Sequence, residues 1–335
     1  MSTSATDTLA EGGDLGLDPG AGGAAVEARA PRQLFWQRFK EDRVAVVALW
    51  VIVALVFVAI FAPLITDVLG APSYDERDRS ALDDLNFGQP EGPSADHFFG
   101  VTPQIGYDVF SRVVYGARTS LLVAFVATGL AALIGVTVGL LAGYYRGWVD
   151  TVLSRLMDVV LAFPIFLLAL GLAASCTIPD SDGNVGCLGG TIKPGLPVVI
   201  IVIVLATWPY FGRLIRGQVL SLRQKEFVEA SRSLGASDRR IIFREILPNL
   251  VAPITVYATL LIPANILFEA ALSFLGVGVR EPTPSWGKMI ADAVDTFQTA
   301  WWFMLFPGLA LLITVMAFNL VGDGLQDALN PRTGK

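Results

Sequence analysis

The sequence predicts an all-α integral membrane protein with six transmembrane helices. Hydrophobic residues make up 53% of the chain and charged residues only 16%, whereas soluble domains carry about 25% charged residues. The apolar residues gather in blocks suited to the ~20 residues that cross a hydrocarbon core. Because these blocks lack the alternation of barrel strands, and backbone groups in lipid must be paired internally, each block is predicted to be a helix. The predicted spans are Val44–Thr66, Thr119–Tyr144, Leu156–Ser175, Leu196–Phe211, Val251–Leu275 and Trp301–Val321.

The whole chain divides into five predicted regions. Residues 1–31 are rich in Gly, Ala, Ser, Thr and Asp and predict a disordered cytoplasmic tail. No apolar core precedes residue 44, which argues against a signal peptide. Residues 32–66 combine an aromatic and basic interfacial helix with the first span, and residues 67–118 form an outer loop long enough to be a small extracytoplasmic subdomain. Residues 119–322 are expected to form a five-helix core, followed by a cytoplasmic tail at 323–335.

Lys and Arg are distributed unevenly between the two sides of the membrane. With the N-terminus inside, the inner segments carry 17 of the 24 basic residues. Basic residues collect in cytoplasmic loops, so both termini are expected in the cytoplasm and the chain in the plasma or inner membrane. The net charge of −6 arises largely from acidic residues in the N-terminal tail and the first outer loop. No basic groove with interleaved aromatic residues indicates a nucleic-acid partner.

A polar, arginine-rich island at residues 226–248, here called the knob, separates two apolar spans. Its first half has a helical pattern that ends at Leu234, and Gly235 follows where a left-handed helix end favours a residue without Cβ. A second helix is expected to begin after Ser237, a suitable N-cap, and to end at Pro248. Arginines cannot enter lipid, so the knob must project from the membrane on the side where basic loops collect.

The knob resembles the EAA loop of ABC importer permeases, the element that docks on the ATPase subunit. The resemblance rests on Glu-Ala-Ser, a glycine four residues later and Leu-Pro at the far end. It departs from the family at Ser231, usually alanine, and at Glu245, usually isoleucine, and both changes keep the helix-glycine-helix arrangement. An ordinary basic loop has no reason to combine these residues at this spacing. The resemblance implies an ATPase-docking role for Glu229, Ala230, Ser231, Leu234, Gly235, Leu247 and Pro248.

Further motifs resemble one subgroup, the second permease of the dipeptide, oligopeptide and nickel importers. Thr102 and Tyr107 stand where this subgroup usually has charged residues, so contacts through those charges are not implied here. Together the matches cover about residues 33–335. The matching segments are 99–102, 108–121, 272–278, 284–290, 306–308 and 318–332.

The resemblance also implies a fold, partners and a mechanism. The fold would be the transmembrane domain of a type I ABC importer. The partners would be a homologous permease subunit, two ATP-binding subunits and an extracytoplasmic solute-binding protein, with peptides or related solutes as cargo. Closure of the ATPase pair would push on the knob and reorient the helices around a central path. Most selectivity in this group resides in the binding protein, so the permease sequence does not identify the solute.

Polar residues recur every three or four positions along the fifth span, apart from one position occupied by Ile262, and therefore share one face of the helix. They are Thr255, Thr259, Asn265, Glu269 and Ser273. A carboxylate deep in a span is expensive and normally faces a partner or water. Asn265, Glu269 and Ser273 are therefore candidates for the lining of the translocation path, and a purely structural bond from Glu269 to a neighbouring helix is the open alternative. Asp158 is expected to be structural, because it lies one turn from Arg155.

Small residues in the second span indicate helix packing. Gly135, Gly139 and Gly143 repeat every four residues, which allows the backbone to approach another helix closely. Small residues are common in membrane helices, so the repeat supports no more than a tightly packed bundle.

Two cysteines and one histidine lie in predicted outer loops. Cys176 and Cys187 fall in the same loop, and a disulfide between them is compatible with an oxidising compartment. Two thiols are too few for a metal site, and His97 belongs to a different loop. His97 is expected to be a solvated loop residue.

The sequence predicts no catalytic, cofactor or metal site. No Gly-x-x-x-x-Gly-Lys-Ser/Thr loop is present, so ATP would have to be bound by a partner. A single histidine in an outer loop disfavours a membrane hydrolase. A different class is an ion-coupled secondary transporter in which Glu269 titrates. Inverted repeats and broken helices would favour that class, and the sequence shows neither.

Overall fold

Five helices are long and apolar enough to cross a membrane in the part of the chain that the computed structural model describes, residues 31–83, 89–176, 192 and 195–329. They are α2 (Arg43–Ile60), α4 (Val109–Tyr144), α7 (Leu196–Leu222), the continuous run Asp238–Phe274, which ends with α10 (Leu247–Phe274), and α12 (Trp301–Leu329). A sixth span results if the bent pair α5 (Trp148–Ala162) and α6 (Ile165–Ser175) is counted as one. The predicted all-α membrane fold is confirmed.

Shorter helices and strands lie at both ends of the long helices. A two-stranded antiparallel ribbon pairs Leu82 with Pro90. The short elements are α1 (Pro31–Glu41), α3 (Ala62–Val68), β1 (Leu82–Asp83), β2 (Gln89–Pro90), α8 (Glu226–Ser233), α9 (Asp238–Arg240), the π-helix η2 (Ile241–Ile246) and α11 (Trp286–Ala293).

The predicted third span, Leu156–Ser175, is wrong as a single helix. The chain breaks between α5 and α6, and the two helices meet at 81°. Pro164 explains the break, because it has no N–H to continue the helix and forces the preceding residue away from helical geometry. Phe163 accordingly has φ −76° and ψ 135°. A broken helix of this kind is a feature that the sequence analysis did not find.

The predicted end of the knob at Pro248 is also wrong. The helix runs without interruption from Asp238 to Phe274, so Pro248 lies in the first turn of α10. Immediately before it, the Leu247 N–H bonds to the carbonyl of Ile242, five residues back. This wider π turn changes the hydrogen-bond register next to Pro248, which has no N–H to donate. The helix therefore continues past the proline without a break.

Several helix ends differ from the predicted spans. The first span is interrupted after Ile60, and Pro63 occupies the first turn of the following α3. Helix α4 begins ten residues before the predicted Thr119, because the Asp108 carboxylate accepts the Ser111 N–H and caps it. Helix α12 continues past the predicted Val321 to Leu329. The loop predicted at 67–118 therefore includes the first turns of α4.

The centre of the bundle is the contact between α4 and α7. The three glycines of the repeat in α4 face α7, where a Cβ on Gly135 would lie 2.5 Å from the Trp208 carbonyl oxygen and one on Gly143 would lie 2.7 Å from the Val219 Cβ. The glycine repeat was predicted to pack against another helix, and α7 is that helix. Helices α2, α10 and α12 complete a second apolar cluster with α4 around Ile266 and Phe318.

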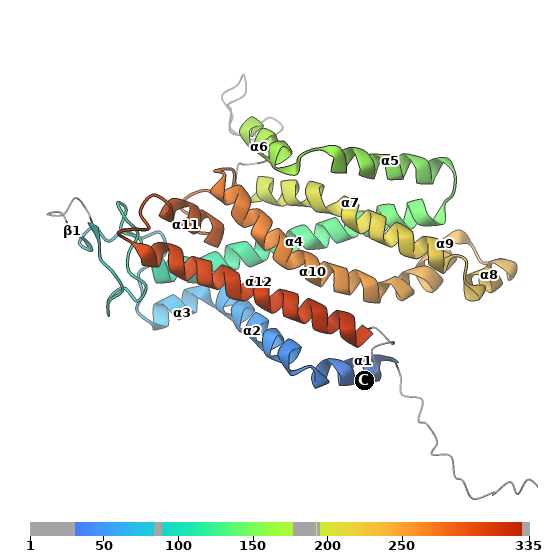
Figure 1. Cartoon of the computed structure of the whole chain (residues 1–335), viewed down its shortest axis with the longest axis horizontal. Helices are drawn as coiled ribbons and strands as arrows, with labels where there is room; N and C mark the ends of the chain where they lie inside the picture. Colours follow the sequence, from blue (N-terminus) through green and yellow to red (C-terminus); the bar gives the residue numbers. More distant parts are fainter. Residues whose placement is uncertain (1–30, 84–88, 177–191, 193–194, 330–335) are drawn as a thin grey trace, which may run out of the picture.

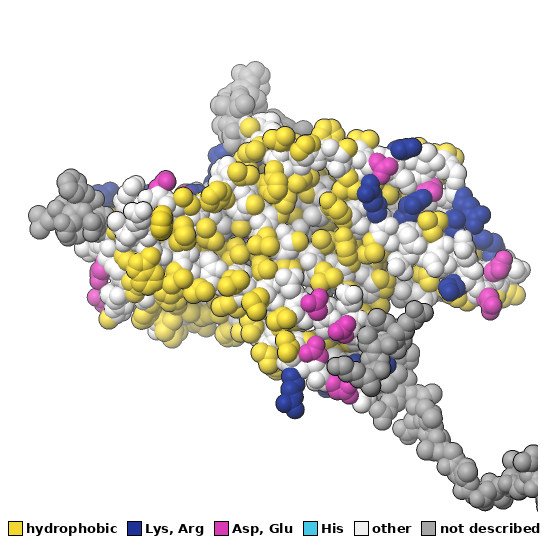
Figure 2. Space-filling view, viewed as in Figure 1, with side chains coloured by type: hydrophobic (Ala, Val, Ile, Leu, Met, Phe, Trp, Pro, Cys, Tyr) yellow, Lys and Arg dark blue, Asp and Glu magenta, His cyan; other side chains and the backbone are white. Residues whose placement is uncertain are grey.

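The two ends of the bundle carry different structures (Figure 1). One end holds the cap, defined here as residues 72–83 and 89–108, and the other holds α8 and α9. Helix α1 and the end of α12 lie on the same side as α8 and α9. Figure 2 shows hydrophobic side chains over the middle of this face, whereas Lys and Arg gather toward the end with α8 and α9.

Candidate functional site

The turn of the knob has the predicted left-handed glycine. Gly235 has φ +78°, and no heavy atom beyond the glycine and its two chain neighbours lies within 4 Å of the position that a Cβ would take. The Ala236 N–H bonds to the Ser231 carbonyl at 3.1 Å and the Gly235 N–H to the Arg232 carbonyl at 3.0 Å, which satisfies the last carbonyls of α8. Ser237 occupies the N-cap position of α9 without a side-chain capping bond. The helix-glycine-helix arrangement is confirmed.

The inner face of the knob is anchored in the bundle. Val228, Ile241 and Ile246 are fully buried. They share an apolar cluster with residues of α4 and α7, namely Leu140, Tyr144, Ile215 and Val219. Burying such side chains contributes about 1.5–3 kcal/mol each, so the knob is packed onto the ends of two central helices.

The outer face of the knob is open. Glu229, Ala230, Leu234 and Gly235 are exposed, and Ser231 is half-buried. The Leu234 side chain is 88% exposed at the turn. Leu247 and Pro248 do not lie at this tip: they begin α10, where Leu247 packs against the apolar cluster that anchors the knob. The predicted docking set therefore separates into an exposed tip, residues 229–235, and a base at 247–248.

Polar side chains tie the knob to the end of α4. The Tyr144 hydroxyl donates to Asp238 Oδ1 at 2.6 Å, and Arg232 Nη2 lies 3.5 Å from the same hydroxyl. Arg223 Nη1 donates to the carbonyls of Gly143 and Tyr144 at 2.9 and 3.4 Å. The sequence analysis missed Tyr144, because its partners lie about ninety residues away in the chain.

Charged pairs fix α5 against α7 at this end. Arg216 makes two bonds to Asp150, at 2.6 and 2.9 Å. Asp158 pairs with Arg213 at 2.6 Å and with Arg155 at 3.8 Å. The structural contact expected between Asp158 and Arg155 is present, and the stronger partner is on the neighbouring helix.

The predicted path residues are enclosed within the subunit. Asn265, Glu269 and Ser273 are each at most 1% exposed. Glu269 accepts hydrogen bonds from Ser120 of α4 at 3.1 Å and from Ser273 at 2.8 Å, and the Ser120 hydroxyl in turn accepts the N–H of Trp286, in the first turn of α11, at 3.4 Å. The carboxylate and the Ser120 hydroxyl together thus join three helices. The bond to a neighbouring helix that the sequence left open is observed, and a role in the path stays a prediction.

Among the described residues, Asn265 makes one polar side-chain contact on the same face. Its Nδ2 donates to Thr128 Oγ1 of α4 at 2.7 Å. The Asn265 Oδ1 atom is buried and has no hydrogen-bond partner among the described residues. An unpaired acceptor is costly in an apolar environment, so Asn265 is incompletely satisfied in this conformation.

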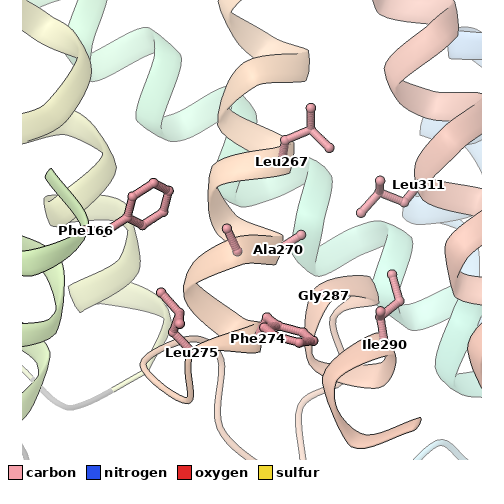
Figure 3. Close-up of a pocket in the computed structure, with 9 residues that line it drawn as sticks. Phe166, Leu267, Ala270, Phe274, Leu275, Gly287, Ile290 and Leu311 are labelled. Carbon is pink, nitrogen blue, oxygen red and sulfur yellow. The ribbon is translucent and has the colours of Figure 1, made fainter. Parts of the chain in front are cut away.

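The opposite face of α10 borders an apolar cavity of about 470 Å³ that is largely open to the surface. Figure 3 shows its lining side chains, which come from α6, α10, α11 and α12, with Phe166, Leu267 and Leu311 pointing toward the space between the helices. The lining also includes Ala270, Phe274 and Gly287. None of the three predicted path residues lines it, so the cavity and the polar face belong to different sides of α10.

His97 is not the solvated residue that the sequence predicts. It is 4% exposed, with Nδ1 3.0 Å from Asp108 Oδ2 and Nε2 3.4 Å from Asp78 Oδ2. Hydrogen bonds from Ser80 hold the pKa of Asp78 below its ordinary value. The imidazole therefore bridges Asp78 to Asp108, the N-cap residue of α4.

Thr102 and Tyr107, the two positions that depart from the subgroup pattern, make structural contacts in the cap. The Tyr107 N–H donates to Thr102 Oγ1 at 2.9 Å. The Arg112 guanidinium lies over the Tyr107 ring at 4.5 Å and pairs with Glu281 at 2.8 Å. These residues hold the cap on α4, which is a structural use that the sequence analysis did not foresee.

Of the predicted disulfide, one cysteine can be placed. Cys176 follows α6 and is 1% exposed, whereas Cys187 lies outside the described residues. The pairing stays a prediction. Among the described residues no group of His, Cys, Asp and Glu is arranged to hold a metal ion.

Comparison with known proteins identifies the family. The family model described as binding-protein-dependent transport system inner membrane component matches residues 135–335. The chain belongs to this family. A second model, described as the N-terminal TM domain of oligopeptide transport permease C, matches residues 30–87. The permease therefore has both a family core and the N-terminal element of one subgroup.

Curated relatives match nearly the whole permease. The dipeptide transport system permease protein DppC of Alkalihalophilus pseudofirmus is 42% identical over 305 residues, covering 91% of each chain. The glutathione transport system permease protein GsiD of Escherichia coli O6:K15:H31 is 42% identical over 306 residues, covering 91% of this chain and 92% of the relative. GsiD of Pectobacterium atrosepticum is 38% identical over 304 residues.

A solved structure shows the same fold. The MetNI methionine ABC transporter, in an inward-facing conformation, matches with a TM-score of 0.53 and 19% identity, covering 65% of this chain and 96% of that chain. At this identity the likeness shows the fold alone. Together with the relatives, it makes this chain a membrane-spanning permease subunit of an ABC transporter, and neither comparison supports an ion-coupled secondary transporter.

Proposed function

We propose that the permease imports peptides or peptide-like solutes, driven by ATP that two partner subunits hydrolyse. The proposal rests mainly on the tip of the knob: an exposed leucine, a left-handed glycine and an exposed glutamate stand on an inner face that is buried in the bundle. An 88% exposed leucine beside arginines suits a protein partner better than lipid. The ATPase subunits are the partner that this family implies.

The cargo follows from the relatives. The names of two relatives specify dipeptides and glutathione, and both are short peptides. A homologous permease subunit and an extracytoplasmic binding protein would complete the assembly in the inner membrane. The excess of basic residues at the knob end supports termini in the cytoplasm.

The path would run beside the polar face of α10. Asn265, Glu269 and Ser273 lie between α10 and α4, and the unpaired Asn265 Oδ1 is the atom best placed to meet solute. Because they are enclosed in this conformation, the proposal requires α4 and α10 to separate during transport. A bridge between Cys176 and Cys187 in the outer loop is part of the proposal, and peptide mapping without reductant tests it.

The test disturbs the tip in the assembled transporter. Glu229→Arg reverses a charge on α8, and Gly235→Val places a branched side chain at φ +78°, which costs roughly 1–2 kcal/mol. Both variants should insert in the membrane normally but lose bound ATPase subunits, or hydrolyse ATP without moving a radiolabelled dipeptide. The readouts are co-purification of the ATPase subunits and uptake by reconstituted vesicles.

Matched controls separate docking from general damage. Gly147 has φ +76° with open space around it but lies between α4 and α5, so Gly147→Val introduces similar strain away from the tip. Asp327→Arg reverses an exposed charge on α12. Both controls should keep ATPase association. Full ATP-driven uptake by Glu229→Arg and Gly235→Val together would refute the docking role.

A further inference from the structure

Tyr144 is the last residue of α4, and its side chain is held firmly. It is 7% exposed and belongs to the apolar cluster that anchors the knob. Arg223, at the end of α7, donates to the carbonyls of Gly143 and Tyr144, so the backbone beneath the ring is fixed by a second helix. The hydroxyl therefore projects from a rigid base.

This one hydroxyl reaches both halves of the knob. It donates to Asp238 in the first turn of the second half at 2.6 Å, and it lies 3.5 Å from Arg232 Nη2 in the last turn of α8. The Arg232 guanidinium also lies 5.9 Å from the centre of the ring. Side chains from either side of the Gly235 turn thus converge on a single atom of α4.

The Asp238 carboxylate contacts α4 although its own helix offers an alternative. In the first turn of a helix, a carboxylate can be satisfied by backbone N–H groups, and the N-cap residue Ser237 makes no side-chain capping bond. Asp238 Oδ1 nevertheless lies at a short distance from the tyrosine hydroxyl. A bond to a charged acceptor is among the stronger hydrogen bonds, so it ties the knob to α4.

Helix α4 connects this contact to the opposite end of the molecule. It spans 36 residues from Val109 to Tyr144. At its other end the Asp108 carboxylate caps the helix and contacts His97 of the cap. A displacement of the knob that is passed to Tyr144 therefore moves a helix that also borders the polar face of α10.

We propose that Tyr144 is a positioning residue for coupling: its hydroxyl holds both halves of the knob at a fixed angle to α4, so that force applied to the knob moves α4. The inference rests on the proposed docking of ATPase subunits at the tip of the knob. Without the hydroxyl, the apolar inner face keeps the knob attached, but the knob can rotate on the end of α4 and part of its displacement is not transmitted.

The test uses Tyr144→Phe in the complete transporter reconstituted in vesicles. Phenylalanine keeps the ring and its packing and removes only the hydroxyl. We expect unchanged assembly with the ATPase subunits and continued ATP hydrolysis. The amount of radiolabelled dipeptide moved per ATP hydrolysed should fall about tenfold, because a factor of about ten is the smallest effect expected from losing one hydrogen bond to a charged group. Hydrogen exchange at residues 226–240 should be faster, whereas exchange in α4 and α7 should be unchanged.

Asp238→Ala, which removes the acceptor of the Tyr144 hydroxyl, and the double variant provide an independent check. If the two residues act through one bond, Asp238→Ala should lower the transport per ATP to a similar degree, and the double variant should show little further loss. Tyr145→Phe is the matched control, because Tyr145 is adjacent, 38% exposed, and its hydroxyl has no hydrogen bond among the described residues. It should keep the wild-type ratio.

The outcomes separate the two proposals. Wild-type transporter that neither binds ATPase subunits nor shows ATP-driven uptake would overturn the proposed function, and the inference with it. Wild-type coupling together with an unchanged transport-to-ATP ratio in Tyr144→Phe would overturn the inference alone. Loss of the ATPase subunits from Tyr144→Phe would also overturn it, since the residue would then act in docking.

Discussion

Gly139 of α4 lies so close to Gly212 of α7 that a Cβ on Gly139 would stand 2.6 Å from the Gly212 carbonyl oxygen. The neighbouring glycines at 135 and 143 meet α7 in the same way, one turn to either side. Backbone contact over three turns fixes the separation of the two central helices. Since the knob packs on the ends of both helices, this contact also determines where the knob stands.

Gly139→Val should therefore disrupt the bundle. The added side chain meets backbone atoms that cannot rotate away, so α4 and α7 must separate, at a cost of typically about 1–3 kcal/mol or more. We expect a lower midpoint of thermal unfolding in detergent and faster proteolysis. Gly129→Val is the control on the same helix, because no atom lies within 4 Å of a Cβ there. Equal stability of the two variants would contradict the packing.

Local patterns in the sequence were enough to predict much of the fold. The apolar blocks predicted the long helices. The glycine repeat predicted that α4 packs closely against another helix, but it did not identify α7 as that helix. Gly235 could be predicted because a left-handed turn is a property of one residue and its neighbours. Each of these features depends on residues within a few turns of one another.

The features that the sequence analysis predicted wrongly or left open depend on the hydrogen-bond register of a helix or on tertiary contacts. The π turn that lets Pro248 enter α10 depends on a change of hydrogen-bond register that periodicity does not show. Burial of His97 requires Asp78 and Asp108 from separate segments. The partner of Glu269 in α4 is 149 residues away. The break at Pro164 did have a local signal, and the apolar composition of the segment concealed it.

Two substitutions of Glu269 should distinguish its contribution to stability from its contribution to transport. Glu269→Leu leaves the hydroxyls of Ser120 and Ser273 without their common acceptor, and each unsatisfied buried group costs about 1–3 kcal/mol. We expect poor assembly and a lower unfolding midpoint. Glu269→Gln keeps an acceptor and the shape of the side chain, so it should assemble normally and change transport more than stability. Normal stability of Glu269→Leu would show that the three-helix junction contributes little.

Cysteine accessibility tests the role of the polar face in the path. In a background that lacks Cys176 and Cys187, single cysteines at positions 265, 269 and 273 should become reactive toward a water-soluble thiol reagent during ATP turnover, because the proposed path opens between α4 and α10. Without nucleotide they should stay protected, as their burial indicates. Positions 267 and 271 on the cavity side are the comparison. If the two sets react equally during turnover, the path lies elsewhere.

Arg112 should be the residue that fixes the cap to α4. Its side chain is buried, pairs with Glu281 at 2.8 Å and covers the Tyr107 ring. Arg112→Met keeps most of the apolar stem but leaves Glu281 and the ring without the guanidinium, and because Glu281 is 41% exposed water can solvate it. We expect a modest loss, about 1–3 kcal/mol, seen as faster proteolysis within residues 72–108 while the membrane helices stay intact. Arg118→Met, on an exposed position of the same helix, is the control. Equal protection of the cap in both variants would mean that the contacts of His97 with Asp78 and Asp108 are enough to hold it.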